Sequence, residues 1–305
     1  MTRKGEVSPD PTAIGDVAAP PFVVLPDPMR LFALRAARLR ALAETSALAP
    51  YLRFLADLAA AQNMTLDGLP EPTRPDADAL ARAKKFEMPP LDRSRILADA
   101  ALAATFDRLF AAAQKIEQPA AAADALARVM QAGLAEQEAM ARAVLADALP
   151  VEAMAEHVYI AAALQIHFAR LAAGLAAGSL VSLGDGTCPA CGGAPSATMV
   201  VGWPGAHGAR FCTCSLCATL WNVVRIKCVL CGSTKGIGYK EIEGGAGAIK
   251  AETCDQCRGW VKILHQHKDP GIDPFADDVA SLGLDLLMRD GPYRRGGVNP
   301  FLAGY

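Results

Sequence analysis

The sequence CPACGGAPSATMVVGWPGAHGARFCTCSLC occupies residues 188–217, and CVLCGSTKGIGYKEIEGGAGAIKAETCDQC occupies residues 228–257. Each stretch begins and ends with a Cys-x-x-Cys pair, and the two stretches have the same length and the same spacing between pairs. The register extends beyond the cysteines, since Gly192 corresponds to Gly232 and Thr213 to Thr253. The constant offset indicates an internal repeat whose unit is a cysteine turn, a β-hairpin, a second cysteine turn and a strand.

The four Cys-x-x-Cys pairs have the spacing of metal ligands. Two intervening residues allow a tight turn that directs both thiolates to one ion, about 2.3 Å from each sulfur when the ion is zinc. A single pair also fits a redox dithiol, but four pairs in one segment predict metal sites. An all-thiolate set suits iron as well as zinc, so two metal ions are predicted, Fe of the rubredoxin type or Zn. The predicted ligands are Cys188, Cys191, Cys214, Cys217, Cys228, Cys231, Cys254 and Cys257.

A duplicated unit should close its own site, so we expect the first two pairs to share one ion and the last two pairs to share the other. The alternative is a cross-braced arrangement, in which the first and third pairs share an ion. A saturated four-thiolate site leaves no position for a coordinated water, which disfavours metal-assisted hydrolysis, and no catalytic residue is predicted. Two such small units have little room for a core, so the ions are expected to contribute to folding.

Several other residues lie near the predicted metal ligands in the sequence. Cys212 corresponds to Glu252 in the second repeat, so the repeat does not require it as a ligand, and we interpret it as a half-buried strand cysteine rather than a reactive thiol or replacement ligand. His265 and His267 follow the second repeat and are interpreted as surface residues, with spare ligands as the alternative. The aromatic residues Trp203, Trp221, Trp260 and Tyr239 are expected to supply packing.

The part of the chain that precedes Cys188 contains no cysteine and has a helical pattern. A helix is predicted from Asp27-Pro28, where an N-cap precedes proline, and its interleaved arginines, including Arg35 and Arg38, are interpreted as a solvated face. His157 and His167 lie on an apolar helix and are interpreted as core histidines. Further helices are predicted near Pro50 and at 76–86, 91–113, 119–147, 151–178 and, after the cysteines, 274–289.

The predicted fold class is therefore α+β, with an N-terminal all-α bundle of about five or six helices, two tandem rubredoxin-like or zinc-ribbon units and a C-terminal helix. Prolines and composition shifts mark the predicted boundaries. They are a flexible lead-in at 1–26, a helical domain at 27–180, metal units at 188–227 and 228–268, and a C-terminal helix and tail at 273–305.

Composition restricts the class of protein. The chain has 305 residues, is 52% hydrophobic and has a formal net charge of −2, which excludes an extended disordered chain and gives no whole-chain argument for binding nucleic acid or an anionic membrane. No secretory signal is visible, and the most apolar segment, 158–183, carries Gln165, His167 and Arg170 in its middle. We therefore expect a cytoplasmic protein without membrane insertion, in which the thiols stay reduced.

The chain resembles the formate dehydrogenase accessory (formation) protein family, FdhE. The resemblance covers most of the chain from about residue 20, and Cys212 departs from the family pattern. The residues that carry it are LPDPMRLFALRAARLRALAE at 25–44, CPACG at 188–192, CSLC at 214–217, WNVVRIKCVLC at 221–231, IKAETCDQC at 249–257, VKILHQHKDP at 261–270, DDVASLGLDLLM at 277–288 and GVNPFL at 297–302.

The resemblance implies a cytoplasmic, non-catalytic maturation factor. Members of this family assist assembly or activation of molybdenum- or tungsten-containing formate dehydrogenases, contact the catalytic subunit before export, and carry iron in rubredoxin-like sites. By position, the eight paired cysteines inherit that metal-binding role, and the helical half is expected to bind the client.

Two other functional classes are open from the sequence. A rubredoxin-like electron carrier would use iron in the cysteine sites. A zinc-ribbon nucleic-acid binder is favoured by eight Lys or Arg against four Asp or Glu in residues 188–267, but these charges are scattered and few aromatics are free to stack on bases, so no nucleic acid is expected. A homodimer is plausible, although no specific feature supports it.

Overall fold

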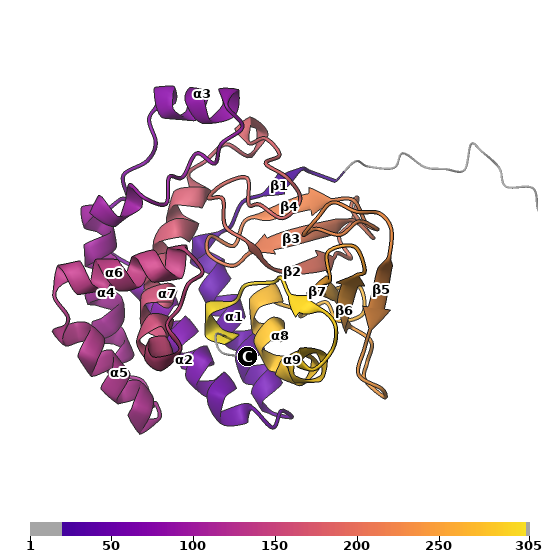
Figure 1. Ribbon diagram of the computed structural model, residues 1–305. Coiled ribbons are helices and arrows are strands. Elements are labelled where there is room, and N and C mark those ends of the chain that lie inside the picture. The colour runs from indigo at the N-terminus through magenta and orange to yellow at the C-terminus, as the bar shows by residue number, and fades with distance from the viewer. Residues whose placement is uncertain (1–19, 303–305) are drawn as a thin grey trace, which may run out of the picture.

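The computed structural model describes residues 20–302, in which a helical region lies beside a mostly antiparallel β-sheet (Figure 1). The helices of the first half are α1 (Pro28–Ala43), α2 (Ala49–Thr65), α3 (Ala77–Lys85), α4 (Ala100–Ala113), α5 (Ala120–Gln131), α6 (Leu134–Leu145) and α7 (Met154–Ala173). Short 3₁₀ turns are η2 (Ile96–Ala98), η3 (Val151–Ala153) and η4 (Ala177–Ser179). The predicted α+β class, with its helices first, is confirmed.

Side-chain caps explain where several helices begin. The carboxylate of Asp27 accepts the N–H of Met29 at 3.1 Å, with Pro28 as the first residue of α1, so this predicted start is confirmed. Asp76 caps α3 by accepting the N–H of Ala79 at 2.7 Å, within the predicted 76–86 segment. The helix predicted near Pro50 begins one residue earlier, at Ala49.

Four long helices predicted from the sequence are interrupted or shorter than predicted. In the segment 91–113, Asp99 caps α4 by accepting the N–H of Ala101 at 3.0 Å, so only η2 precedes it. The segment 119–147 breaks at Ala132 and Gly133, where the side chain of Glu136 accepts the Gly133 N–H. The segment 151–178 ends as a helix at Ala173, and 274–289 divides at Ser281 into α8 (Pro274–Ala280) and α9 (Leu282–Arg289). The alanine-rich segments 91–113, 119–147 and 151–178 favour helix along their whole length, which hides where their helices begin and end.

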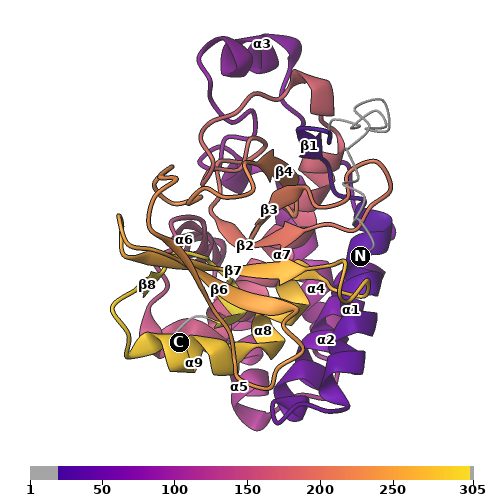
Figure 2. The same ribbon diagram turned by 90° about the vertical axis from the view of Figure 1, so that its right-hand side faces the viewer.

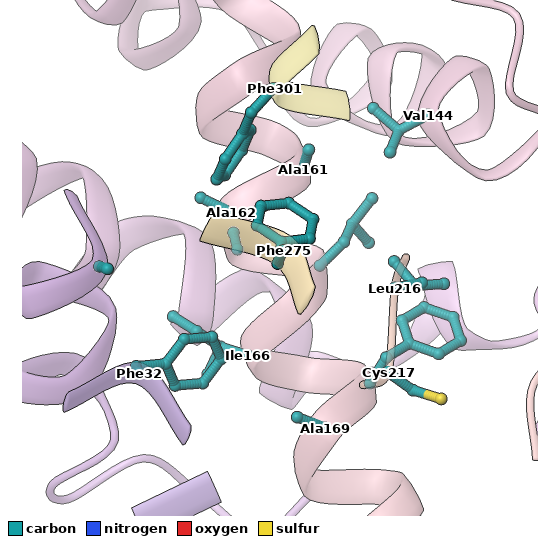
Figure 3. Close-up of a cluster of buried hydrophobic side chains, with 14 of the residues drawn as sticks. Phe32, Val144, Ala161, Ala162, Ile166, Ala169, Leu216, Cys217, Phe275 and Phe301 are labelled. Atoms are coloured by element: carbon teal, nitrogen blue, oxygen red, sulfur yellow. The ribbon is translucent and has the colours of Figure 1, made fainter. Parts of the chain in front are cut away.

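Helix α7 is the centre of the core. It packs against α1, α2, α4, α5 and α6, and nearly all of its residues from His157 to Ala172 are buried. Figure 3 shows Phe32 of α1, Phe275 of α8 and Leu216 and Cys217 of the first repeat gathered around α7, so the helical region and the first cysteine unit share one core. Among the residues that the structure describes, no helix has the length and apolarity needed to cross a membrane.

The prediction of a flexible lead-in at residues 1–26 is wrong for Val23 and Val24. Residues 1–19 lie outside the described part of the chain, but Val23–Val24 form strand β1, which pairs antiparallel with Leu220 and Trp221 of β4. Val23 is buried in the main core. Two residues are too short to give a strand signal in the sequence, and only the tertiary partner makes them a strand.

The cysteine repeats form one sheet. Its strands are β2 (Pro195–Val200), β3 (Arg210–Cys214) and β4 (Leu220–Val223) from the first repeat, then β5 (Ile237–Lys240), β6 (Ile249–Cys254) and β7 (Gly259–His265) from the second. The order is β1-β4-β3-β2-β7-β6-β5, and β8 (Arg294–Arg295) also pairs with β7. Within the sheet the strands of each repeat lie in reverse order of sequence, β4-β3-β2 and then β7-β6-β5. The first strand of the first repeat, β2, therefore pairs in parallel with the last strand of the second repeat, β7.

A buried ion pair crosses the seam between the repeats. The Nη2 of Arg210 on β3 donates to Oε1 of Glu252 on β6 at 2.7 Å, and both side chains are almost fully enclosed. These residues correspond to Lys250 and Cys212 of the opposite repeat, so this contact accounts for one place where the two repeats differ in sequence. Of the aromatic residues expected to pack, Trp221 and Trp260 are buried and Trp203 is partly buried, whereas Tyr239 is exposed.

The C-terminal segment is held by charged groups on two sides. Helices α8 and α9 lie against the sheet (Figure 2), and Lys262 of β7 forms buried ion pairs with Asp278 and Asp285. On the other side, Arg38 of α1 binds Asp277 at 2.6 Å. The guanidinium of Arg35 lies 4.4 Å from the ring centre of Phe275. Interpreting Arg35 and Arg38 as part of a solvated face is therefore wrong, because they bind partners from the opposite end of the chain.

Candidate metal centres

The first four-cysteine site lies where the first repeat meets the helical region. Cys188 and Cys191 precede β2, Cys214 ends β3 and Cys217 precedes β4. The Sγ atoms of Cys188 and Cys217 are 3.6 Å apart, and those of Cys191 and Cys214 are 3.5 Å apart. All four sulfur atoms lie within 4.8 Å of one another and all four residues are buried.

The second site repeats this geometry with the last four cysteines. The Sγ atoms of Cys228 and Cys257 are 3.8 Å apart, and those of Cys231 and Cys254 are 3.7 Å apart. The sequential grouping expected from the repeat is thereby confirmed, and the cross-braced alternative is wrong. Within residues 20–302 these two sets are the groups of metal-ligating side chains that come close enough to hold an ion.

The sulfur–sulfur distances fit a tetrahedral ion. A metal–sulfur bond of about 2.3 Å in a regular tetrahedron separates neighbouring sulfurs by about 3.8 Å. A disulfide would bring the two sulfurs to about 2.05 Å, and all eight of these cysteines are free. The donor set and its spacing therefore fit a zinc or iron ion in each site.

The turns that carry the ligands have the same backbone in both repeats. The N–H of Gly192 donates to the carbonyl of Cys188 at 2.8 Å, and the N–H of Gly232 does the same to Cys228 at 2.8 Å. Both glycines have positive φ angles, +72° and +75°, which a side chain would disfavour. Backbone N–H groups of Leu216 and Cys217 also point at Cys214 Sγ, each at 3.4 Å.

Burial makes it unfavourable to ionise several cysteines of the first site unless a cation is bound. Burial raises the pKa of the Cys188 thiol well above its ordinary value, and hydrogen bonds with the other three cysteines raise it further. Burial acts in the same direction on Cys214, but hydrogen bonds with Cys188, Cys191 and Cys217 outweigh it and lower the pKa of Cys214 well below the ordinary value. One thiolate is thus stabilised by its neighbours, whereas four buried thiolates can coexist only around a positive ion.

The helical region encloses the first site. The N–H of Leu91 donates to the carbonyl of Ala190, between Cys188 and Cys191, at 3.1 Å. The Nε2 of Gln165 on α7 donates to the carbonyl of Ser215, between Cys214 and Cys217, at 3.0 Å. Sequence reasoning missed Leu91 and Gln165, because no local pattern shows that residues so distant in the sequence contact a cysteine turn.

Cys212 stays outside both sets. It is fully buried, its Sγ lies 3.5 Å from the carbonyl oxygen of Asp185, and burial raises its pKa above the ordinary thiol value. The half-buried cysteine predicted from the sequence is therefore completely buried, and the high pKa makes it a poor nucleophile.

The histidines do not join the cysteines. The ring centre of His267 lies 5.4 Å from that of His265 and 6.1 Å from that of His207. They take no part in either set, so the alternative of spare ligands is wrong for this structure. His157 and His167 are buried in α7, as predicted. The Nε2 of His167 lies 3.4 Å from Asp99, yet burial outweighs this carboxylate and lowers the pKa of His167 to about 4.

Comparison with known proteins places both sites within one family. Models of the FdhE N-terminal, central and C-terminal domains match residues 20–185, 187–225 and 226–302 in that order. The chain belongs to the FdhE family. Each cysteine set, with its own hairpin, falls into a different FdhE domain model, the central one and the C-terminal one.

Individual FdhE proteins resemble this chain over nearly its whole length. An FdhE homologue of Rhizobium meliloti is 52% identical over 301 residues, which cover 98% of each chain. FdhE of Escherichia coli K12 is 36% identical over 288 residues, covering 92% of this chain and 91% of that protein. The crystal structure of the FdhE protein from Pseudomonas aeruginosa has a TM-score of 0.83 and 34% identity, and the match covers 93% of this chain and 99% of that one.

Proposed function

We propose that this protein is a cytoplasmic accessory factor that assists maturation of a molybdenum- or tungsten-containing formate dehydrogenase by binding its catalytic subunit. The observation that carries the proposal is the ordered match to all three FdhE domain models, which together span residues 20–302. The name of this family denotes formate dehydrogenase formation, and members of it match this chain almost end to end.

In this role the eight paired cysteines hold two metal ions. Each set offers four sulfur donors, which saturate a tetrahedral ion and leave no position for substrate. When bound, zinc would supply rigidity and iron would also supply one-electron redox chemistry. The thiolates then orient the cysteine turns, and the turns fix the ends of β3 and β6. This arrangement supports a non-catalytic role.

The decisive experiment is capture of the client. The full-length chain is immobilised under reducing, oxygen-free conditions and presented with the catalytic subunit of a formate dehydrogenase prepared without its cofactor. We expect retention of the subunit by the metal-loaded chain. Absence of binding in these conditions contradicts the proposal, and the cofactor-loaded mature subunit serves as the comparison for maturation-state specificity.

Electron transfer is the second candidate function, and one observation favours it. Cys231 and Cys257 are exposed, so an iron ion in the second site would lie close to the surface, where an electron can reach a partner. Metal analysis and visible absorption of protein purified without oxygen test this candidate. Iron–thiolate bands that bleach on reduction support it, and a colourless protein with zinc alone excludes it.

Self-association stays a prediction. Sedimentation velocity over a range of concentrations tests the homodimer, and a single species of 31.9 kDa at all concentrations would contradict it.

A further inference from the structure

The two cysteine sites have the same ligand geometry but very different access to solvent. All four cysteines of the first site are buried, each at most 2% exposed. In the second site Cys228 and Cys254 are buried, whereas Cys231 and Cys257 are exposed. One cysteine of each turn in the second site therefore faces outward, and together they form an open edge of the four-sulfur set.

Three parts of the helical region close the first site. The Leu91–Ala190 and Gln165–Ser215 hydrogen bonds hold a loop and α7 against the two cysteine turns. A third part is Arg93. A Cβ placed on Gly193 would lie 3.2 Å from Cys214 Sγ and 3.6 Å from Nη2 of Arg93, so Gly193 separates this guanidinium from the sulfur by no more than the width of its own backbone. Arg93 therefore brings a positive charge near a thiolate set that carries net negative charge with a divalent ion, and Asp147 is an acidic neighbour of both.

The second site is closed only on its inner side. Leu230, between Cys228 and Cys231, fits against Gly259 and Gly296, where a Cβ on either glycine would collide with it. On the outer side the turn residues Asp255, Gln256 and Arg258 are all exposed. The equivalent residues of the first site include Ser215 and Leu216, which are buried. Nothing in the described part of the chain covers Cys231 and Cys257.

We infer that the two sites divide their work: the first holds its ion permanently as part of the core, and the second exchanges a thiophilic ion with the surroundings while the protein stays folded. Exchange begins when an incoming chelating ligand forms a bond to the ion at the open edge. The bond from the ion to Cys231 or Cys257 then breaks, and the released thiolate takes a proton from water. The same attack on the first site requires prior displacement of the loop around Leu91 or of α7, which is a partial unfolding.

The test uses the full-length chain loaded with two equivalents of Zn²⁺ and challenged with excess 4-(2-pyridylazo)resorcinol, whose absorbance reports zinc release. We expect two phases of one equivalent each, with rates at least about tenfold apart, because the slow phase needs a local opening of the fold. Circular dichroism should show unchanged helix content after the fast phase. Release of both ions in a single phase overturns the inference.

Alkylation of cysteines shows which site has lost its zinc after the fast phase, and this experiment needs no amino-acid substitution. N-ethylmaleimide added after the fast phase, followed by peptide mass spectrometry, should label the exposed Cys231 and Cys257 and leave the first four cysteines unlabelled. Labelling of the first four instead overturns the inference. Cys231→Ser should abolish the fast phase and retain the slow one, and persistence of the fast phase in this variant contradicts the assignment.

Arg93→Ala provides a variant that leaves every ligand in place. Loss of this cation should speed the slow phase and leave the fast phase unchanged, whereas Lys235→Ala, an exposed lysine in the loop after Cys231, should leave the slow phase unaltered. An unchanged slow phase in the Arg93→Ala protein would contradict a contribution of this guanidinium to retention of zinc in the first site. The inference rests on the proposed binding of two ions. A chain that retains fewer than two zinc ions therefore defeats both, while failed client capture alone defeats only the accessory role.

Discussion

The first and second cysteine sites are two copies of one local structure placed in different surroundings. Their cysteines are spaced identically, and their turns share the glycine conformation after the first pair. The closest sulfur–sulfur distances are 3.5 and 3.6 Å in the first site and 3.7 and 3.8 Å in the second. The first site is nevertheless part of the main hydrophobic core with α7, whereas the second has two exposed ligands. Ligand spacing is thus a property of the repeat, and accessibility is a property of what packs on it.

Replacing one ligand in each site should break the symmetry most strongly. Cys191→Ser removes a fully buried ligand, so we expect loss of its ion and destabilisation by more than about 4 kcal/mol, because metal binding and core packing are lost together. The matched change Cys231→Ser should cost only about 1–2 kcal/mol, because this ligand faces solvent. Metal content and thermal unfolding by circular dichroism measure both. Equal destabilisation would mean that the two sites contribute equally to the fold.

The ion pair across the seam tests whether the two repeats fold as one sheet. Arg210→Ala leaves Glu252 buried without its partner, so we expect destabilisation of about 3–5 kcal/mol in denaturant unfolding. The equivalent residue of the second repeat, Lys250, pairs with Glu241 near the surface, and Lys250→Ala should cost less than about 1 kcal/mol. If both substitutions have small effects, the seam does not depend on this pair.

The surroundings of the two sites can also be compared without changing a ligand. Leu216 and Gln256 are equivalent residues in the second cysteine turn of each repeat. Leu216 is buried in the core, so Leu216→Gln should cost about 3 kcal/mol through lost apolar contacts and an unsatisfied amide. The reciprocal change at the exposed Gln256, Gln256→Leu, should lie within about 0.5 kcal/mol of the parent. The midpoints of urea unfolding of the two variants measure this difference in stability. Similar midpoints would contradict the burial of the turn that carries Leu216.

One pH-dependent loss of stability should originate in α7, separately from any release of metal as the cysteine ligands become protonated. The pKa of His167 is about 4 in the folded protein because of burial, below the ordinary value of 6.5, so the unfolded chain binds the extra proton first. Stability contributed by neutral His167 is therefore complete above about pH 6.5 and is lost as the pH falls toward 4, by about 2–3 kcal/mol. His167→Gln should flatten this part of the stability curve, measured by denaturant unfolding at several pH values. An unchanged slope would assign the effect to other groups.

The sequence predicted what depends on local spacing. Cys-x-x-Cys turns and the constant offset between the repeats are local signals, so the ligand sets and their grouping followed from them. Contacts over long separations were not predictable. Arg35 and Arg38 have the helical spacing of surface residues, and only the folded chain brings Phe275 and Asp277 to them. The signal for unequal exposure was present, since Ser-Leu stands in one turn where Asp-Gln stands in the other, but its meaning depended on knowing what covers the first turn.

The way in which the repeats join has a consequence for how such a protein can grow. The first strand of one repeat, β2, pairs with the last strand of the other repeat, β7. The two repeats are therefore related by a translation across the sheet, and the two ends of the sheet differ from each other, as in a head-to-tail assembly. One end is terminated by β1, a strand borrowed from outside the repeats. The other end is β5, which pairs only with β6 in the described part of the chain and carries Lys240 at its end. A third unit would find the same edge geometry there, whereas the capping strand β1 and the edge lysine disfavour further strand pairing at the two ends.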